Sequence, residues 1–163
     1  MAPSQSIQQL ITGQGVKTPV DVIPTGVDLK LFAKGRGDNF RKQYGINAQT
    51  FVIGHVGRLA LEKNLAYLTR AVAHSLKKNP EAIFAVVGNG RARDAIRRIF
   101  NDEGVADSLI MTGPLTGQAW QTPTRHLTSL YCLQIRNPGH GAHEAMAAGA
   151  PVVAVEASGV RKS

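Results

Sequence analysis

The sequence contains little cysteine and few aromatic residues. The single cysteine, Cys132, excludes an internal disulfide and any zinc site built from several thiolates, and it favours a reducing compartment. Aromatic residues make up only 6% of the chain, which leaves no evident platform for stacking single-stranded bases. No apolar run approaches the roughly 20 residues that cross a bilayer. The opening stretch MAPSQSIQQLITGQG lacks the early cations and apolar core of a signal peptide.

These absences favour a cytoplasmic protein, with peripheral contact at the inner membrane face left open as an alternative. The 163 residues are 43% hydrophobic, enough for one domain with a core. The net charge of +8 suits nucleic acid, an anionic membrane surface or phosphorylated small molecules. A local cluster at Arg91, Arg93, Arg97 and Arg98 is more typical of a solvated helix face than of a binding stripe. The net charge is the only feature that favours nucleic-acid binding. We therefore expect no nucleic-acid partner.

The stretch Phe51–Asn64, FVIGHVGRLALEKN, is the most informative part of the chain. Its apolar start breaks at Gly54 and Gly57 and leads into a long amphipathic segment, which predicts a strand, a tight loop and a helix. Arg58 lies in the loop and Lys63 follows five residues later. Two cations beside flexible backbone at a helix start suit a diphosphate. The alternative is an ordinary loop with two solvated cations.

Strands alternate with helices along most of the chain, which predicts a parallel sheet with flanking helices and a site at the carboxyl ends of its strands. The turn Gly88-Asn89-Gly90 lacks the spacing of a dinucleotide fingerprint. The strands are expected over 20–23, 51–56, 82–87, 109–112 and 152–155. The helices are expected from a Ser4 cap through Leu10, over 40–44 with Asp38 as cap and Gly45 as stop, and over 65–78 and 92–103.

Several motifs, in the right order, resemble the family-four retaining glycosyltransferases of the GT-B fold. They are Val22–Asp28 with Phe32, Gly57–Asn64, Val86–Gly90, Thr112-Gly113 and Glu144–Ala154. The resemblance implies an α/β fold, a Rossmann-like parallel sheet with flanking helices that forms the second half of a GT-B fold. It also implies transfer of a hexose from a nucleotide-diphosphate sugar with retention.

The resemblance also implies roles for individual residues. Arg58 and Lys63 would hold the diphosphate, and Gly57 would let the backbone approach it closely. Gly88 and Gly90 would lie against the donor nucleotide. Glu144 would accept hydrogen bonds from the ribose hydroxyls. No catalytic residue is assigned, and neither a metal nor a cofactor is expected beside the sugar donor.

By the same resemblance, residues 1–19 correspond to the tail of an acceptor-binding domain and a linker. Residues 20–163 correspond to an incomplete nucleotide-sugar-binding domain. A lipid or glycan acceptor would be held by the first domain, so we expect this polypeptide to be inactive as a fragment. The alternative function is a non-catalytic nucleotide-binding module of the same fold.

The stretch from Trp120 to His143 does not fit this pattern and shows neither a helical stripe nor strand alternation. The family has a glutamate eight positions before Glu144, where this chain has Arg136. Codons that encode Ile135–His143 can be chosen so that a frame one nucleotide later reads Ser-Glu-Thr-Gln-Gly-Met-Val-Leu, which resembles the family. A shift of two nucleotides over 119–132 gives a second resembling peptide. The hypothesis is a frameshifted segment, and the alternative is a divergent loop.

Overall fold

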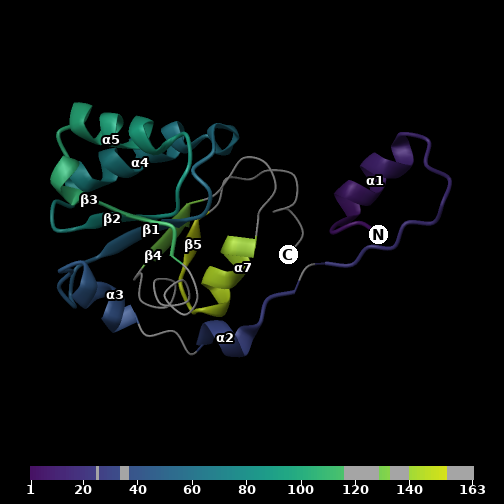
Figure 1. Ribbon diagram of the computed structural model, residues 1–163, viewed down its shortest axis with the longest axis horizontal. Helices are drawn as coiled ribbons and strands as arrows, with labels where there is room; N and C mark the ends of the chain where they lie inside the picture. The colour runs from purple at the N-terminus through teal and green to yellow at the C-terminus, as the bar shows by residue number, and fades with distance from the viewer. Residues whose placement is uncertain (25, 34–36, 116–128, 133–139, 154–163) are drawn as a thin grey trace.

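The computed structural model describes residues 1–24, 26–33, 37–115, 129–132 and 140–153. Figure 1 shows the arrangement of the elements. The helices are α1 (Gln5–Gly13), α2 (Leu29–Ala33), α3 (Gly37–Gln43), α4 (Leu65–Lys78), α5 (Arg93–Asp102) and α7 (His140–Ala147), with short 3₁₀ turns η1 (Leu61–Lys63) and η2 (Ala106–Ser108). The strands are β1 (Val52–Val56), β2 (Ile83–Val87), β3 (Leu109–Gly113), β4 (Ser129–Cys132) and β5 (Val152–Val153).

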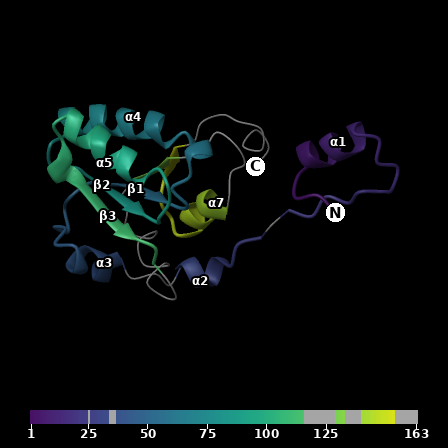
Figure 2. The same ribbon diagram turned by 45° about the horizontal axis from the view of Figure 1, so that its top comes forward.

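The five strands form one parallel sheet in the order β3-β2-β1-β4-β5. The chain moves outward from β1 through β2 to β3, then returns to place β4 on the other side of β1. This reversal places α4 and α5 on one face and α3 and α7 on the other, as Figures 1 and 2 show. The expected Rossmann-like parallel sheet with flanking helices is confirmed. The point of reversal is where such sheets bind ligands, beyond the carboxyl ends of the strands.

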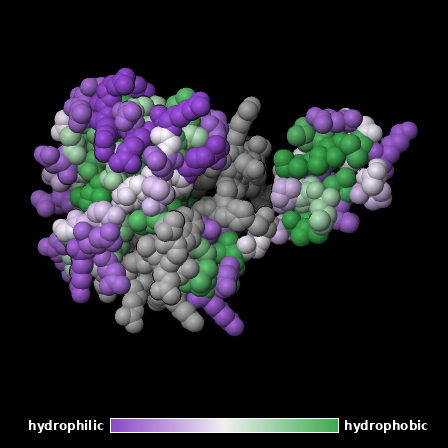
Figure 3. Space-filling view, in the orientation of Figure 1, coloured by the Kyte–Doolittle hydropathy of each residue, from purple (hydrophilic) through white to green (hydrophobic). Residues whose placement is uncertain are grey.

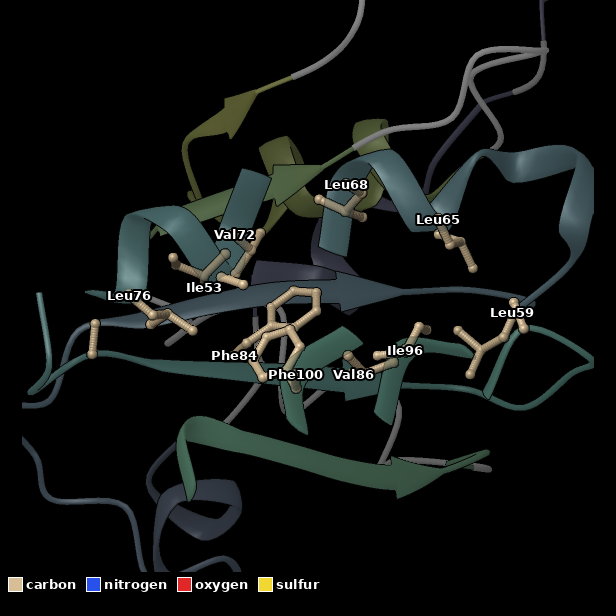
Figure 4. Close-up of a cluster of buried hydrophobic side chains, with 13 residues drawn as sticks. Ile53, Leu59, Leu65, Leu68, Val72, Leu76, Phe84, Val86, Ile96 and Phe100 are labelled. Carbon is tan, nitrogen blue, oxygen red and sulfur yellow. The ribbon is translucent and has the colours of Figure 1, made fainter. Parts of the chain in front are cut away.

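A cluster of buried side chains joins α4 and α5 to one face of the sheet (Figure 4). The apolar residues of α4 recur at helical spacing, which gives that helix a single buried stripe. Its members Leu65, Leu68, Val72 and Leu76 are all at most 5% exposed. The expected bounds of this helix, 65–78, are those observed.

Phe84 of β2 and Phe100 of α5 stack within this cluster, with ring centroids 5.6 Å apart. Both side chains are almost completely buried. The alternate positions of the strands face the other way, where Val52 and Val87 pack with Phe40 of α3. Because both faces are covered, β2 is apolar throughout, as is typical of parallel strands, and β1 is buried along its whole length although Gly54 and His55 interrupt its apolar residues.

The strand expected over 20–23 is wrong. The only pairing there is an isolated bridge between Ala2 and Val22. Pro19 and Pro24 flank the segment, and proline cannot donate a backbone hydrogen bond to a ladder. Asp38 is also not a cap, because α3 begins one residue earlier at Gly37.

The expectation that the stretch 120–143 lacks a strand of the sheet is wrong, and the start of a helix lies in it as well. Residues Ser129–Cys132 form β4, which pairs with β1 on one side and β5 on the other. The first four residues of α7, 140–143, also belong to this stretch. A strand of four residues is too short to show a clear alternating pattern in the sequence. It is identified as a strand only by its pairing with β1 and β5. Arg136, and with it most of the predicted frameshift, lies outside the described residues.

Helix α1 lies apart from the sheet in both views of the ribbon. Ser4 caps it as expected, its hydroxyl accepting a hydrogen bond from the Ile7 amide at 3.3 Å. Figure 3 shows an apolar surface on this part of the chain, and a largely hydrophilic surface over α4 and α5. Within the described part of the chain, no helix is both long and apolar enough to cross a membrane.

The stacked pair inside the sheet predicts a large loss of stability on truncation. Phe100→Ala removes a fully buried ring and leaves a cavity, so we expect the free energy of unfolding to fall by about 3–5 kcal/mol. Phe51→Ala is the matched control, because that ring is 48% exposed and its loss should cost only about 0.5 kcal/mol. Urea unfolding of both variants measures the difference. Equal losses would contradict the assignment of this cluster as the core.

Candidate functional site

The loops that follow β1 and β2 are joined by their backbones at the carboxyl edge of the sheet. The Gly57 amide donates to the Val87 carbonyl at 2.9 Å, and the Leu59 amide donates to the Asn89 carbonyl at 2.9 Å. The Ala92 amide donates back to the Leu59 carbonyl at 2.9 Å. The pairing of the two strands therefore continues into their loops, which fixes the loops relative to each other without any side chain.

Two of the predicted glycines are required by this close approach. A Cβ on Gly88 would lie 1.9 Å from the Gly57 carbonyl oxygen, and a Cβ on Gly90 would lie 2.3 Å from the Leu59 carbonyl oxygen. Both glycines also have positive φ angles, +137° and +151°, which side chains rarely adopt. The Gly88 amide donates to the Gly113 carbonyl at 2.9 Å, so the loop after β3 joins the same arrangement.

A cleft of about 290 Å³ opens beside these loops. It lies where β1, β2 and β3 end together. The lining residues are Val56, Gly57, Arg58, Val87, Gly88, Asn89, Pro114 and Leu115. Sequence reasoning found Gly57, Arg58 and Gly88 but did not assign Asn89, Pro114 or Leu115 to the site. Their signal is position, because each lies one or two residues after the end of a strand, and Asn89 also falls within the motif Val86–Gly90.

Arg58 lies at the cleft with its side chain 70% exposed, and its Nη2 lies 2.5 Å from Oε1 of Glu62. Lys63 follows at the end of η1. Burial, together with repulsion from Arg58, lowers the pKa of Lys63 below its usual value, and attraction to Glu62 partly opposes that shift. The two cations that the sequence singled out are therefore electrostatically coupled neighbours, although Lys63 does not line the cleft itself.

The chain turns sharply from η1 into α4. Asn64 adopts the left-handed conformation there, with φ +48° and ψ +40°, as the only described residue other than glycine with a positive φ. Asparagine tolerates this conformation better than most residues. The turn starts α4 close to Lys63, so the helix N-terminus is held near both cations.

Glu144 lies in α7, on the opposite side of β1 from the two glycine loops, and is half-buried. It is not among the described residues that line the cleft. The structure therefore brings Gly57, Arg58, Lys63, Gly88 and Gly90 together and places Glu144 on a separate element. That element follows β4, so it starts at the same edge of the sheet. Among the described residues, no group of three or more histidine, cysteine or carboxylate side chains could hold a metal ion.

Comparison with protein families places this geometry in context. Residues 37–163 match the family model described as "Glycosyl transferases group 1". The 2-deoxystreptamine N-acetyl-D-glucosaminyltransferase of Streptomyces fradiae is 34% identical over 148 residues, which cover 87% of this chain and 35% of the relative. The D-inositol 3-phosphate glycosyltransferase of Corynebacterium jeikeium is 30% identical, over 96% of this chain and 40% of the relative. The chain thus spans 35–40% of the length of these two relatives.

Solved structures share the fold. The crystal structure of HepE from Anabaena in complex with UDP and glucose superposes with a TM-score of 0.79 at 26% identity, over 96% of this chain and 44% of HepE. Sucrose-phosphate synthase from Thermosynechococcus elongatus has a TM-score of 0.77 at 23% identity, over 98% of this chain and 41% of that protein. The second likeness bears on the fold alone.

The close approach of the two loops predicts that Gly88→Ala disrupts the site. The new methyl group would collide with backbone, and the positive φ adds strain of about 1–3 kcal/mol. We expect lower stability and faster hydrogen exchange at the amides of Gly57 and Leu59. Gly13→Ala is the control, because nothing lies within 4 Å of its added Cβ. Unchanged exchange at both amides in Gly88→Ala would refute the backbone pairing of the loops.

Proposed function

Because this chain belongs to the group 1 glycosyltransferases, we propose that residues 20–163 form the donor domain of a hexosyltransferase. The donor is a nucleotide-diphosphate sugar. The observation that carries the proposal is the cleft at the strand ends, where the Gly57 and Gly88 backbones meet the Arg58 side chain. Glycine backbones allow close approach of a ligand, and the arginine supplies positive charge for a diphosphate.

The chemistry of such a transfer explains why cations belong at this position. As the bond between the sugar and the diphosphate breaks, negative charge develops on the leaving diphosphate. Arg58 and Lys63 would stabilise that charge in place, which lowers the barrier of the step. Arginine suits this role because its planar guanidinium can donate two parallel hydrogen bonds to phosphate oxygens. In this proposal no metal and no further cofactor takes part.

We further propose that Glu144 accepts hydrogen bonds from the ribose hydroxyls of the donor. The support is chemical and topological. A carboxylate is an acceptor for two neighbouring hydroxyl groups. Helix α7 follows β4 and therefore starts at the edge of the sheet where the cleft opens. Gly90, which holds the second loop against Leu59, completes the nucleotide side of the site.

Retention of the anomeric configuration is also proposed, as in the family-four enzymes that the motifs 57–64 and 144–154 resemble. The acceptor is proposed to be a lipid or a glycan held by a further domain, with the protein at the cytoplasmic face of a membrane. NMR of the product's anomeric proton would test retention: a product of opposite configuration to the donor would reject it.

The frameshift is retained as a proposal for the residues around Arg136. Its support is that the shifted reading of 135–143 resembles the family's Ser-Glu-Thr-Gln-Gly loop, which includes a glutamate. Sequencing the gene decides it, because codons that cannot yield the shifted peptide exclude the frameshift. In that case Arg136 is a true substitution of a cation for a carboxylate.

If the two cations clamp the diphosphate, alanine at either position should weaken binding of UDP by about 1–3 kcal/mol, the scale of a charge-assisted hydrogen bond. Titration calorimetry with UDP on the variants Arg58→Ala and Lys63→Ala measures this loss. Lys78→Ala is the matched control, since that exposed lysine ends α4, about 20 Å along the helix from its start. Unchanged affinity in both test variants would remove the phosphate role.

We expect the 163-residue chain by itself to bind UDP without transferring sugar. Transfer requires an acceptor held against the donor, and such positioning is worth about 7–11 kcal/mol of the barrier. The described residues form a single sheet domain, whose cleft is assigned to the donor. Product formation from several nucleotide sugars, with lipid and simple acceptors, measures it. Turnover above the blank without enzyme would contradict this expectation.

A further inference from the structure

The Arg58 side chain forms an ion pair with a carboxylate of its own loop. Its Nη2 lies 2.5 Å from Oε1 of Glu62, four residues later, and both side chains are more than half exposed. Arg58 lines the cleft, whereas Glu62 lies on η1 outside the lining. The guanidinium that is proposed to receive the diphosphate is therefore paired with a carboxylate of its own chain.

The charges of both Arg58 and Glu62 also act on Lys63. The positive charge of Arg58 lowers the pKa of Lys63, and the negative charge of Glu62 raises it. The carboxylate therefore acts on both cations and offsets their mutual repulsion while no anion is bound. A bound diphosphate would likewise offset the repulsion between Arg58 and Lys63. The carboxylate of Glu62 would repel that diphosphate.

We propose that Glu62 is a displaceable counter-ion for Arg58, which sets the affinity for the nucleoside diphosphate and speeds its release. The inference rests on the proposed function, because it takes the diphosphate as the ligand of Arg58. On binding, the diphosphate replaces the carboxylate at the guanidinium. After transfer, the ion pair between Glu62 and Arg58 forms again as the nucleoside diphosphate leaves. Product release is a step that often limits turnover.

The exposure of the pair makes this exchange energetically easy. Solvent-exposed ion pairs stabilise a protein only weakly, so breaking one costs little. A diphosphate carries more negative charge than one carboxylate and can meet both cations at once. The exchange therefore favours the bound diphosphate, but by less than the two cations alone would provide.

Glu62→Gln tests the proposal, because it removes the charge and keeps the shape of the side chain. We expect this variant to bind UDP about two- to fivefold more tightly, the range that follows from the typical strength of an exposed ion pair. Most of the gain should come from slower dissociation, as measured by stopped-flow fluorescence or surface plasmon resonance. Added salt should shrink the gain, because exposed charges are screened.

Three controls separate a counter-ion from a structural residue. Glu81→Gln removes another exposed glutamate, which lies just before β2 and so at the opposite edge of the sheet, and should leave UDP affinity unchanged. Uridine, which lacks phosphate, should bind Glu62→Gln and the parent chain alike. In the Arg58→Ala background, Glu62→Gln should lose most of its effect. Glu62→Ala serves as a second charge-removing variant should the glutamine variant unfold at lower temperature than the parent.

The outcomes distinguish this inference from the proposed function. Equal or weaker UDP binding by both Glu62 variants overturns the inference, and would mean that the carboxylate orients the arginine rather than competing for it. If Arg58→Ala leaves UDP affinity unchanged, the diphosphate role of Arg58 itself is lost. If Arg58→Ala weakens binding while the Glu62 variants do not strengthen it, the proposed function survives and the counter-ion role does not.

Discussion

The hydrogen bonds between the loops after β1 and β2 are the constraint on which the site depends. Three bonds of 2.9 Å lock the segment 57–59 against the segment 87–92. They leave no room for a Cβ at Gly88 or Gly90. Since these bonds join backbone groups only, they position the loops without using side chains, which remain available to contact a ligand. Arg58 lines the cleft from within this joined segment, and its guanidinium pairs with Glu62.

The charged residues of the site also lie close together in the sequence. One carboxylate, Glu62, acts on both Arg58 and Lys63, and all three belong to a single turn of chain. This turn begins at the rigid loop and ends at Asn64, whose left-handed conformation starts α4. Because Arg58 and Lys63 are only five residues apart, the fold of one short segment keeps these two like charges close together. In the proposed site, a bound diphosphate would relieve the mutual repulsion of the two cations.

Much of this was accessible from the sequence. A continuous apolar run indicated β2, an apolar start that breaks at Gly54 indicated β1, and one apolar stripe gave the bounds of α4. The glycines of the site were found through the motifs that resemble the family, and the structure supplies the reason for Gly88 and Gly90, whose positive φ angles and close backbone contacts both select glycine. Local patterns failed where tertiary pairing decides, as in the four residues of β4 and the proline-flanked segment 20–23. Cleft residues such as Pro114 carry no pattern, since only their place after a strand brings them to the site.

The strand order has a consequence for how the molecule acquires its binding loops. β1, β2 and β3, with the two helices between them, are consecutive in the chain and adjacent in the sheet. Every backbone hydrogen bond that joins the glycine loops falls within this one contiguous unit. Contacts of short sequence separation close with little loss of chain entropy, so such a unit is suited to form early in folding. The lining of the cleft comes from this unit and from the two residues that follow it, whereas the pairing of β4 with β1 closes a longer stretch of chain.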